Sequence, residues 1–125
     1  MRLFLVRHAH ADPGEPDALR PLSERGREEA RALAERLNAA EPELVLTSPL
    51  LRARETAVAI ATATGAELRI DERLAPGATA EDVLAVADGG TVVIVGHQPD
   101  CSEIALALAG REIDFPTAGH AVIEL

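Results

Sequence analysis

Short runs of aliphatic residues alternate with segments of helical pattern along almost the whole chain, and this alternation restricts the fold more than any other feature. The clearest run, Thr-Val-Val-Ile-Val at 91–95, is typical of a strand that is buried on both faces. We expect strands at 2–6, 43–47, 67–70, 91–95 and 121–125, and helices at 23–40, 48–65, 79–87 and 100–110. This order predicts an α/β fold: a three-layer sandwich whose mostly parallel central sheet carries helices on both faces.

The expected helix boundaries carry recognisable capping residues. Ser23 is a candidate N-cap, and Ser48 followed by Pro49 predicts a helix with Ser as its cap and Pro at its first position. Two further pairs, Thr79 with Asp82 and Asp100 with Glu103, have capping-box spacing. Gly65 and Gly110 are candidate left-handed residues that end a helix. These signals support the alternation of strands and helices.

Length and charge restrict the partners of this chain. Its 125 residues fit a single domain spanning 1–125, and a hydrophobic content of 47% with only two Phe predicts an aliphatic core. Acidic residues outnumber basic ones by 21 to 12, which gives a formal net charge of -9. This charge argues against nucleic-acid binding and against attraction to anionic membranes, while a few converging basic residues can still bind one anion.

The cysteine content and the short hydrophobic runs predict a cytoplasmic protein. The lone Cys101 excludes an intramolecular disulfide framework and a Cys-based zinc site, and we expect it to be a buried structural thiol. The N-terminal apolar run is too short for a signal peptide, and no run approaches the roughly 18 residues that span a bilayer. We therefore expect a cytoplasmic location.

Basic and nucleophilic side chains follow the expected strands at the positions where a ligand site belongs. In parallel α/β sheets, ligands bind beyond the carboxyl ends of the strands. The first strand is followed by Arg7 and His8. The second is followed by Ser48 and Arg52, and the fourth by His97. Because guanidinium groups match phosphate oxygens and a neutral imidazole can attack phosphorus, the pattern favours a site for a phosphoryl group.

Four segments carry motifs with a characteristic order and spacing. They are Arg7-His8, Leu22-Ser23-Glu24-Arg25-Gly26, the stretch Thr-Ser-Pro-Leu-Leu-Arg-Ala-Arg-Glu-Thr at 47–56, and Val95-Gly96-His97. In this order they resemble the motifs of the histidine phosphatase superfamily, also called phosphoglycerate mutase-like. Within that superfamily, the short chain and Arg20-Pro21-Leu22 are most similar to the SixA-type phosphohistidine phosphatases.

The resemblance implies a role for each matching side chain. His8 would be the nucleophile that becomes transiently phosphorylated, while Arg7, Arg52 and His97 would hold the phosphoryl oxygens. Arg20 would add a phosphate contact from the loop, and water would then release inorganic phosphate. Because these side chains neutralise the phosphoryl charge, the resemblance implies neither a metal nor a cofactor. The implied partner is a protein that carries phosphohistidine, or else a small phosphoester.

Two positions depart from the superfamily's pattern or match it loosely. Ala9 stands where the family usually has Gly, which bears on how closely the backbone can approach the substrate. Glu72 lies in the region where larger members have a Glu that protonates the leaving group, so it is the candidate acid, against the alternative of a solvated carboxylate. The chain lacks the long insertions of the mutases, which predicts an open site that admits a protein side chain. The oligomeric state is left open.

Two other functions fit parts of the sequence. His8, His10 and Asp12 have the His-x-His-x-Asp spacing of a metal site, so a metal-dependent hydrolase is one alternative, although Pro13 stands where a further His normally follows. A non-catalytic phosphate-binding module is the other, and the joint presence of a nucleophile and phosphate ligands argues against it. His120 is isolated near the C-terminus and receives no role.

Overall fold

The structure, a computed structural model that describes residues 1–125, contains one five-stranded sheet with the strand order β3-β2-β4-β1-β5. The strands are β1 (Arg2–Arg7), β2 (Leu44–Thr47), β3 (Glu67–Ile70), β4 (Thr91–Gly96) and β5 (His120–Glu124). β1 pairs in parallel with β4, β4 with β2 and β2 with β3, whereas β5 runs antiparallel to β1. The predicted mostly parallel sheet is therefore confirmed, and all five expected strands form.

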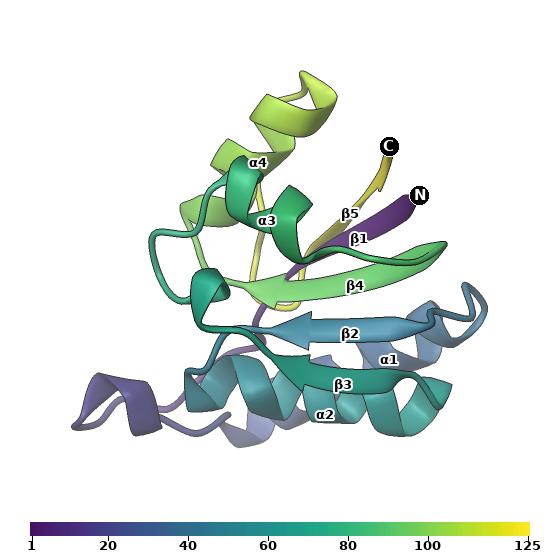
Figure 1. Cartoon of the computed structure of the whole chain (residues 1–125). Helices are drawn as coiled ribbons and strands as arrows, with labels where there is room; N and C mark the ends of the chain where they lie inside the picture. The colour runs from purple at the N-terminus through teal and green to yellow at the C-terminus, as the bar shows by residue number, and fades with distance from the viewer.

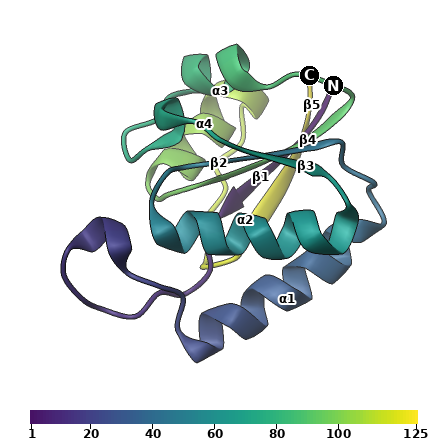
Figure 2. The ribbon, with the colours of Figure 1, turned by 60° about the horizontal axis from the view of Figure 1, so that its bottom comes forward.

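Helices cover both faces of this sheet. They are α1 (Glu24–Asn38), α2 (Leu51–Thr64), α3 (Ala80–Val86), α4 (Asp100–Ala109) and the short 3-10 helices η1 (Asp17–Leu19) and η2 (Glu72–Leu74). α1 and α2 lie together on one face, and α3 and α4 lie on the other (Figure 1, Figure 2). The predicted three-layer sandwich is therefore confirmed. None of the helices combines the length and the apolar character needed to cross a membrane.

The sheet divides the core into two aliphatic layers. Along β1, Leu3 and Leu5 belong to the layer beneath α3 and α4, while Phe4 and Val6 belong to the layer beneath α1 and α2. Alternate side chains of a strand leave opposite faces, so a strand covered on both sides needs a continuous apolar run. Each such side chain that is removed from water contributes about 1.5–3 kcal/mol, which makes this burial the main source of stability.

Most of the predicted helix boundaries are confirmed. At the start of α1, Ser23 Oγ accepts a hydrogen bond from the amide of Gly26 (3.0 Å). Thr79 and Asp82 form the reciprocal capping box of α3. α2 and α4 end at the two predicted glycines, which take the left-handed conformation with φ of 75° and 67°. A side chain there would be strained, so glycine is the residue that suits these stops.

The starts of α2 and α4 differ from the prediction. α2 begins at Leu51 rather than directly after Ser48, whose hydroxyl contacts a histidine ring at the edge of the sheet. Asp100 is the first residue of α4 and Pro99 is its N-cap, while the Asp100 carboxylate accepts a hydrogen bond from the amide of Gly77 (2.8 Å). Both side chains bind partners that are distant in the sequence, which a local capping pattern cannot reveal.

Gly26, in the first turn of α1, is expected to tolerate no side chain. A Cβ atom at this position would overlap the backbone carbonyl group of His10. We expect Gly26→Ala to lower the free energy of unfolding by about 3 kcal/mol, since the backbone must shift to remove the overlap. Urea denaturation measures this change. Gly96→Ala is the matched control for stability, because no atom beyond its two chain neighbours lies within 4 Å of its Cβ position. Equal losses in both variants would contradict the steric explanation.

Candidate active site

The carboxyl ends of β1, β2 and β4 meet at one edge of the sheet, and most of the predicted site residues lie at that edge. In Figure 1 the arrowheads of β2, β3 and β4 all point toward this edge, from which the loop that bears η1 extends. Arg7 is the last residue of β1, and His8 follows it. His97 follows β4, and Arg52 lies in the first turn of α2. The parallel pairing of Arg7 with Gly96 brings the two histidines to the same level.

The His8 ring has one nitrogen held by the backbone and the other free. Its Nδ1 lies 2.7 Å from the carbonyl oxygen of Ala9, which can only accept, so Nδ1 carries the proton and donates. Nε2 therefore bears a lone pair, which is the form that a nucleophilic imidazole needs. The ring lies beside that of His97, with the two ring centroids 5.3 Å apart.

His97 is 4% exposed, and one of its ring nitrogens is buried without a hydrogen-bond partner. Its Nε2 lies 2.7 Å from Ser48 Oγ, and this oxygen also accepts a hydrogen bond from the amide of Leu50 (3.2 Å). We assign the Ser48 hydroxyl as the donor to Nε2, which places the His97 proton on Nδ1. Nδ1 is buried without a partner in the protein. An unpartnered buried donor is costly, so this N–H is suited to bind an oxygen of a ligand.

Arg7 supplies a second unpartnered donor. Its Nη1 donates to the carbonyl oxygen of Phe115 (3.0 Å), which orients the guanidinium group, while Nε is buried without a partner. The guanidinium group keeps its charge at every working pH. The charge of Arg7 and the free N–H groups of Arg7 and His97 are features that suit an anion.

Arg52 and Arg20 meet at Asp17, a residue of η1 for which no motif predicts a role. Arg52, 8% exposed, donates from Nη1 to the Asp17 carbonyl oxygen (3.0 Å) and from Nη2 to Asp17 Oδ2 (3.2 Å). Arg20 donates from Nη1 to Asp17 Oδ1 (3.1 Å) and from Nε to the carbonyl oxygen of Asp12 (2.8 Å). One carboxylate therefore bridges the loop arginine and the helix arginine.

Thr56 ties α2 to the loop that follows β1. Its hydroxyl donates to the carbonyl oxygen of Arg52 (2.8 Å) and accepts from the amide of Ala9 (3.0 Å). Ala9 is completely buried in a small cluster with Leu22 and Ala30. Its methyl group therefore packs into the interior, and the departure from the family's usual Gly is accommodated away from the exposed edge. The motif contains Thr56, but only the structure shows what the hydroxyl contacts.

Burial keeps both histidines uncharged at neutral pH. Loss of hydration is the main reason that the pKa of His8 falls from 6.5 to about 4, and the charges of Arg52 and Arg7 lower it further, against the opposing hydrogen bond to Ala9. Burial likewise lowers the pKa of His97 from 6.5 to about 4, followed by the effects of His8 and Arg52. His8 therefore keeps its lone pair under physiological conditions.

These pKa values predict an unusually acid-tolerant pH profile. Protonation of His8 removes the lone pair, and because its pKa is lowered, the neutral form persists well below pH 6.5. We expect kcat/KM for a phosphate ester, corrected for ionisation of the substrate, to stay level down to about pH 5 and to fall around pH 4. A decline centred near pH 6.5 would contradict the burial argument. NMR titration of the His8 ring gives the same pKa independently of turnover.

Glu72 stands apart from this group of side chains. It is exposed on η2, after the outer strand β3, and no hydrogen bond or ion pair joins it to His8, Arg52 or His97. Its assignment as the acid stays a prediction.

Two other candidate groups have structural partners. His10 Nδ1 lies 2.6 Å from Ser23 Oγ, and no three His, Cys, Asp or Glu side chains gather at distances that suit a metal ion. The His-x-His-x-Asp spacing therefore does not produce a metal-binding geometry. Cys101 is buried with its Sγ 3.7 Å from the carbonyl oxygen of Val6, and burial raises the pKa of its thiol to about 12. The expected buried thiol is therefore confirmed.

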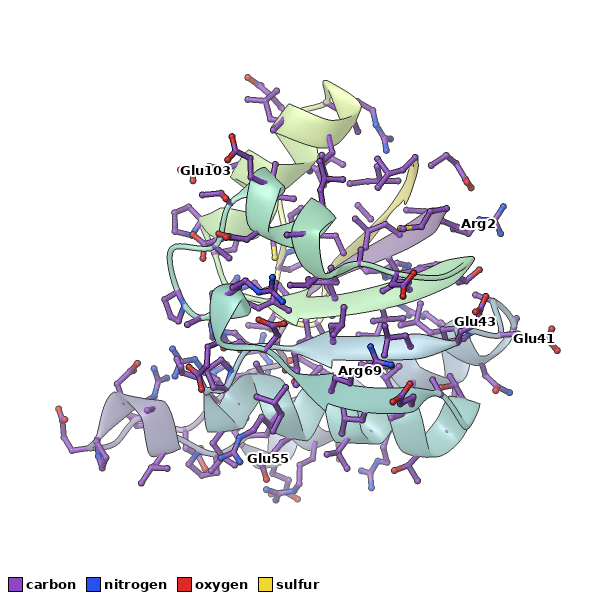
Figure 3. The ribbon with its side chains drawn as sticks, viewed as in Figure 1. Arg2, Glu41, Glu43, Glu55, Arg69 and Glu103 are labelled. Atoms are coloured by element: carbon purple, nitrogen blue, oxygen red, sulfur yellow. The ribbon has the colours of Figure 1, made fainter.

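The candidate site does not coincide with any hollow of the surface. One of the largest hollows, about 460 Å³, lies between α1 and α2 and is lined in part by Glu55 (Figure 3). None of the surface hollows is lined by Arg7, His8 or His97. His8 is partly exposed at this edge, whereas Arg52 and His97 are buried beneath it.

Comparison with known families identifies the class of this protein. The pattern of the histidine phosphatase superfamily (branch 1) matches residues 3–76, which is more than half of the chain. The chain belongs to this superfamily. The match includes Arg7, His8, Arg20 and Arg52, and it stops before His97.

Individual relatives place the chain near SixA within the superfamily. An uncharacterised protein of Picosynechococcus is 37% identical, over 95% of this chain and 82% of its own. The SixA protein of Agrobacterium tumefaciens is 31% identical with a TM-score of 0.84, over 97% of this chain and 89% of its own. The structure of the protein histidine phosphatase SixA with tungstate has a TM-score of 0.88 at 26% identity, over 100% and 88% of the two chains. The chain is thus a SixA-like member of a phosphatase superfamily.

Proposed function

We propose that this protein is a phosphohistidine phosphatase that works through a phosphohistidine intermediate on its own His8. The observation that carries the proposal is the pair of buried, unpartnered donors, Arg7 Nε and His97 Nδ1, beside a neutral imidazole with a free Nε2. A phosphoryl group bound at this edge satisfies both donors and meets the nucleophile. Electrostatic stabilisation by preorganised donors is the main source of catalysis in phosphoryl transfer.

The reaction proceeds in two displacements on phosphorus. His8 Nε2 donates its lone pair to phosphorus as the bond from phosphorus to the substrate nitrogen breaks, and the leaving imidazole takes a proton from solvent. Arg7, Arg52 and Arg20 neutralise the charge on the phosphoryl oxygens, and the uncharged His97 donates a hydrogen bond to one of them. Water then attacks phosphorus, the bond to Nε2 breaks and inorganic phosphate leaves, which restores His8. An imidazole is a better leaving group than an alkoxide, so this substrate does not require a dedicated acid.

Protein-borne phosphohistidine is the substrate that best fits the open edge. The imidazole of such a substrate must reach His8 while the protein that carries it stays outside. SixA, the neighbour with tungstate, is a protein histidine phosphatase, which supports the same substrate class here. The reaction as proposed uses no metal, and the cytoplasmic location stays a prediction.

A substrate comparison tests this proposal. We expect kcat/KM for a protein phosphorylated on histidine to exceed that for 4-nitrophenyl phosphate and for 3-phosphoglycerate, and we expect EDTA to leave all three rates unchanged. A reversed ranking would contradict the substrate assignment while keeping the chemistry. Loss of activity in EDTA that zinc restores would favour a metal-dependent hydrolase instead.

A small-molecule phosphomonoesterase is the second candidate. Glucosyl-3-phosphoglycerate phosphatase of Mycobacterium tuberculosis is 40% identical over 80 residues, although these cover only 58% of this chain and 35% of that protein. Since the likeness covers only part of each chain, it supports phosphatase chemistry more than it supports a particular leaving group. The same substrate comparison distinguishes the two candidates.

A further inference from the structure

The carboxylate of Asp17 lies where the two outer phosphate-binding arginines converge. Its two oxygens accept hydrogen bonds from different guanidinium groups, Oδ1 from Arg20 (3.1 Å) and Oδ2 from Arg52 (3.2 Å). A carboxylate and a phosphoryl group compete for the same guanidinium geometry, because both present oxygens that suit the N–H fork. Asp17 therefore holds donors that the proposed substrate needs.

We propose that Asp17 is a specificity-determining residue whose carboxylate stands in for the phosphoryl group on Arg20 and Arg52 until a substrate displaces it. This inference rests on the proposed phosphoryl site. Bound phosphate and an undisplaced Asp17 would place two anions against the same pair of guanidinium groups, where they repel one another. The anion that enters must therefore bind better than the tethered carboxylate.

The loop that carries Asp17 can move at low cost. No residue of η1 is buried, and the Asp17 side chain is 63% exposed, so its displacement uncovers little apolar surface. Arg52, in contrast, is 8% exposed on the rigid helix α2 and stays in place. The site therefore opens by movement of Asp17, not by movement of the helix arginine.

The contact persists throughout the neutral pH range. Hydrogen bonding to Arg20, and then the charge of Arg52, hold the pKa of Asp17 below its usual value, so the carboxylate stays ionised. A phosphoryl dianion has three terminal oxygens and more charge than a carboxylate, and it outcompetes Asp17 for the arginines. A carboxylate ligand has no such advantage. Because an anion must displace Asp17 before it binds the two arginines, the site favours phosphoryl groups over weaker anions.

The test measures competitive inhibition by inorganic phosphate in Asp17→Asn, with 4-nitrophenyl phosphate as the substrate. We expect Ki for phosphate and KM to fall by about five-fold, the size expected from the loss of exposed ion pairs, while kcat does not rise. If Asp17 only orients the two arginines, Ki rises instead. An unchanged or higher Ki overturns the inference.

Two controls keep this result interpretable. Glu124→Gln removes the same charge from an exposed ion pair with Arg2, which lies at the opposite edge of the sheet (Figure 3), and it should leave Ki unchanged. Asp17→Ala removes the side chain while keeping the backbone carbonyl that accepts from Arg52, and it should lower Ki as Asp17→Asn does. If the unmodified protein neither turns over the ester nor binds phosphate, the proposed function fails, which is a different outcome from a raised Ki.

Discussion

His8→Ala is expected to abolish turnover of 4-nitrophenyl phosphate, with a loss of about 10⁵-fold in kcat, as found when a nucleophile is removed from an enzyme. The reason is that no other side chain at the edge presents a free nitrogen lone pair. His97 Nε2 is bound to Ser48, and we assign the ring proton to its Nδ1. The remaining donors can still bind phosphate, so the variant should lose the reaction and keep the affinity for the product.

A second readout follows the intermediate itself. Incubation with labelled phosphohistidine protein, quenched at alkaline pH because phosphohistidine is labile to acid, should trap label on the unmodified chain and none on His8→Ala. Phosphate binding without a trapped intermediate would support a non-catalytic phosphate-binding module. Full activity in His8→Ala would end the nucleophile assignment.

His10→Ala is the matched control for His8→Ala. His10 lies two residues away and has the same side chain, but its ring is bound to Ser23 Oγ (2.6 Å) beside the start of α1. We expect this variant to keep activity within about threefold, since the His10 ring contacts Ser23 and none of the reacting groups. A metal site built from His8, His10 and Asp12 predicts the opposite, because the loss of either histidine would then inactivate the protein.

The sheet and its carboxyl edge could be predicted because both follow from local patterns. In a chain that alternates strands with helices, the aliphatic run at 91–95 fits a buried strand, and parallel strands end at a common edge of the sheet. Arg7, His8 and His97 come directly after strands, so their convergence needed no knowledge of long-range packing. The resemblance to the superfamily then implied their roles.

The contacts that orient these side chains could not be predicted, because they join residues that are distant in the sequence. Asp17 meets Arg52 only because the loop at 11–21 folds back over the start of α2. Arg7 is held by the carbonyl oxygen of Phe115, a backbone group with no sequence signal. The same cause explains the wrong helix starts, since Ser48 also contacts His97 and the Asp100 carboxylate accepts from the distant amide of Gly77.

Arg52→Ala is expected to give the second large loss of activity, about 10³-fold in kcat/KM, the effect of removing a preorganised donor to a developing negative charge. Arg52 is 8% exposed on α2, so its charge acts through less water than that of an exposed arginine. Both displacements transfer the same phosphoryl group, so formation and hydrolysis of the intermediate should slow together. Quenched-flow measurement of phosphorylated His8 would resolve the two steps.

Arg52→Lys separates charge from geometry. Lysine keeps the positive charge but lacks the planar guanidinium fork. We therefore expect kcat/KM of Arg52→Lys to be only about tenfold higher than that of Arg52→Ala. Arg69→Ala is the matched control for removal of an arginine, because Arg69 is exposed on β3 and pairs with Glu67 alone. It should leave kcat/KM unchanged. If Arg52→Ala lowered the rate no more than Arg69→Ala does, the phosphoryl group would have to be held by Arg7, Arg20 and His97 without Arg52, and the contact of Arg52 with Asp17 would then be structural.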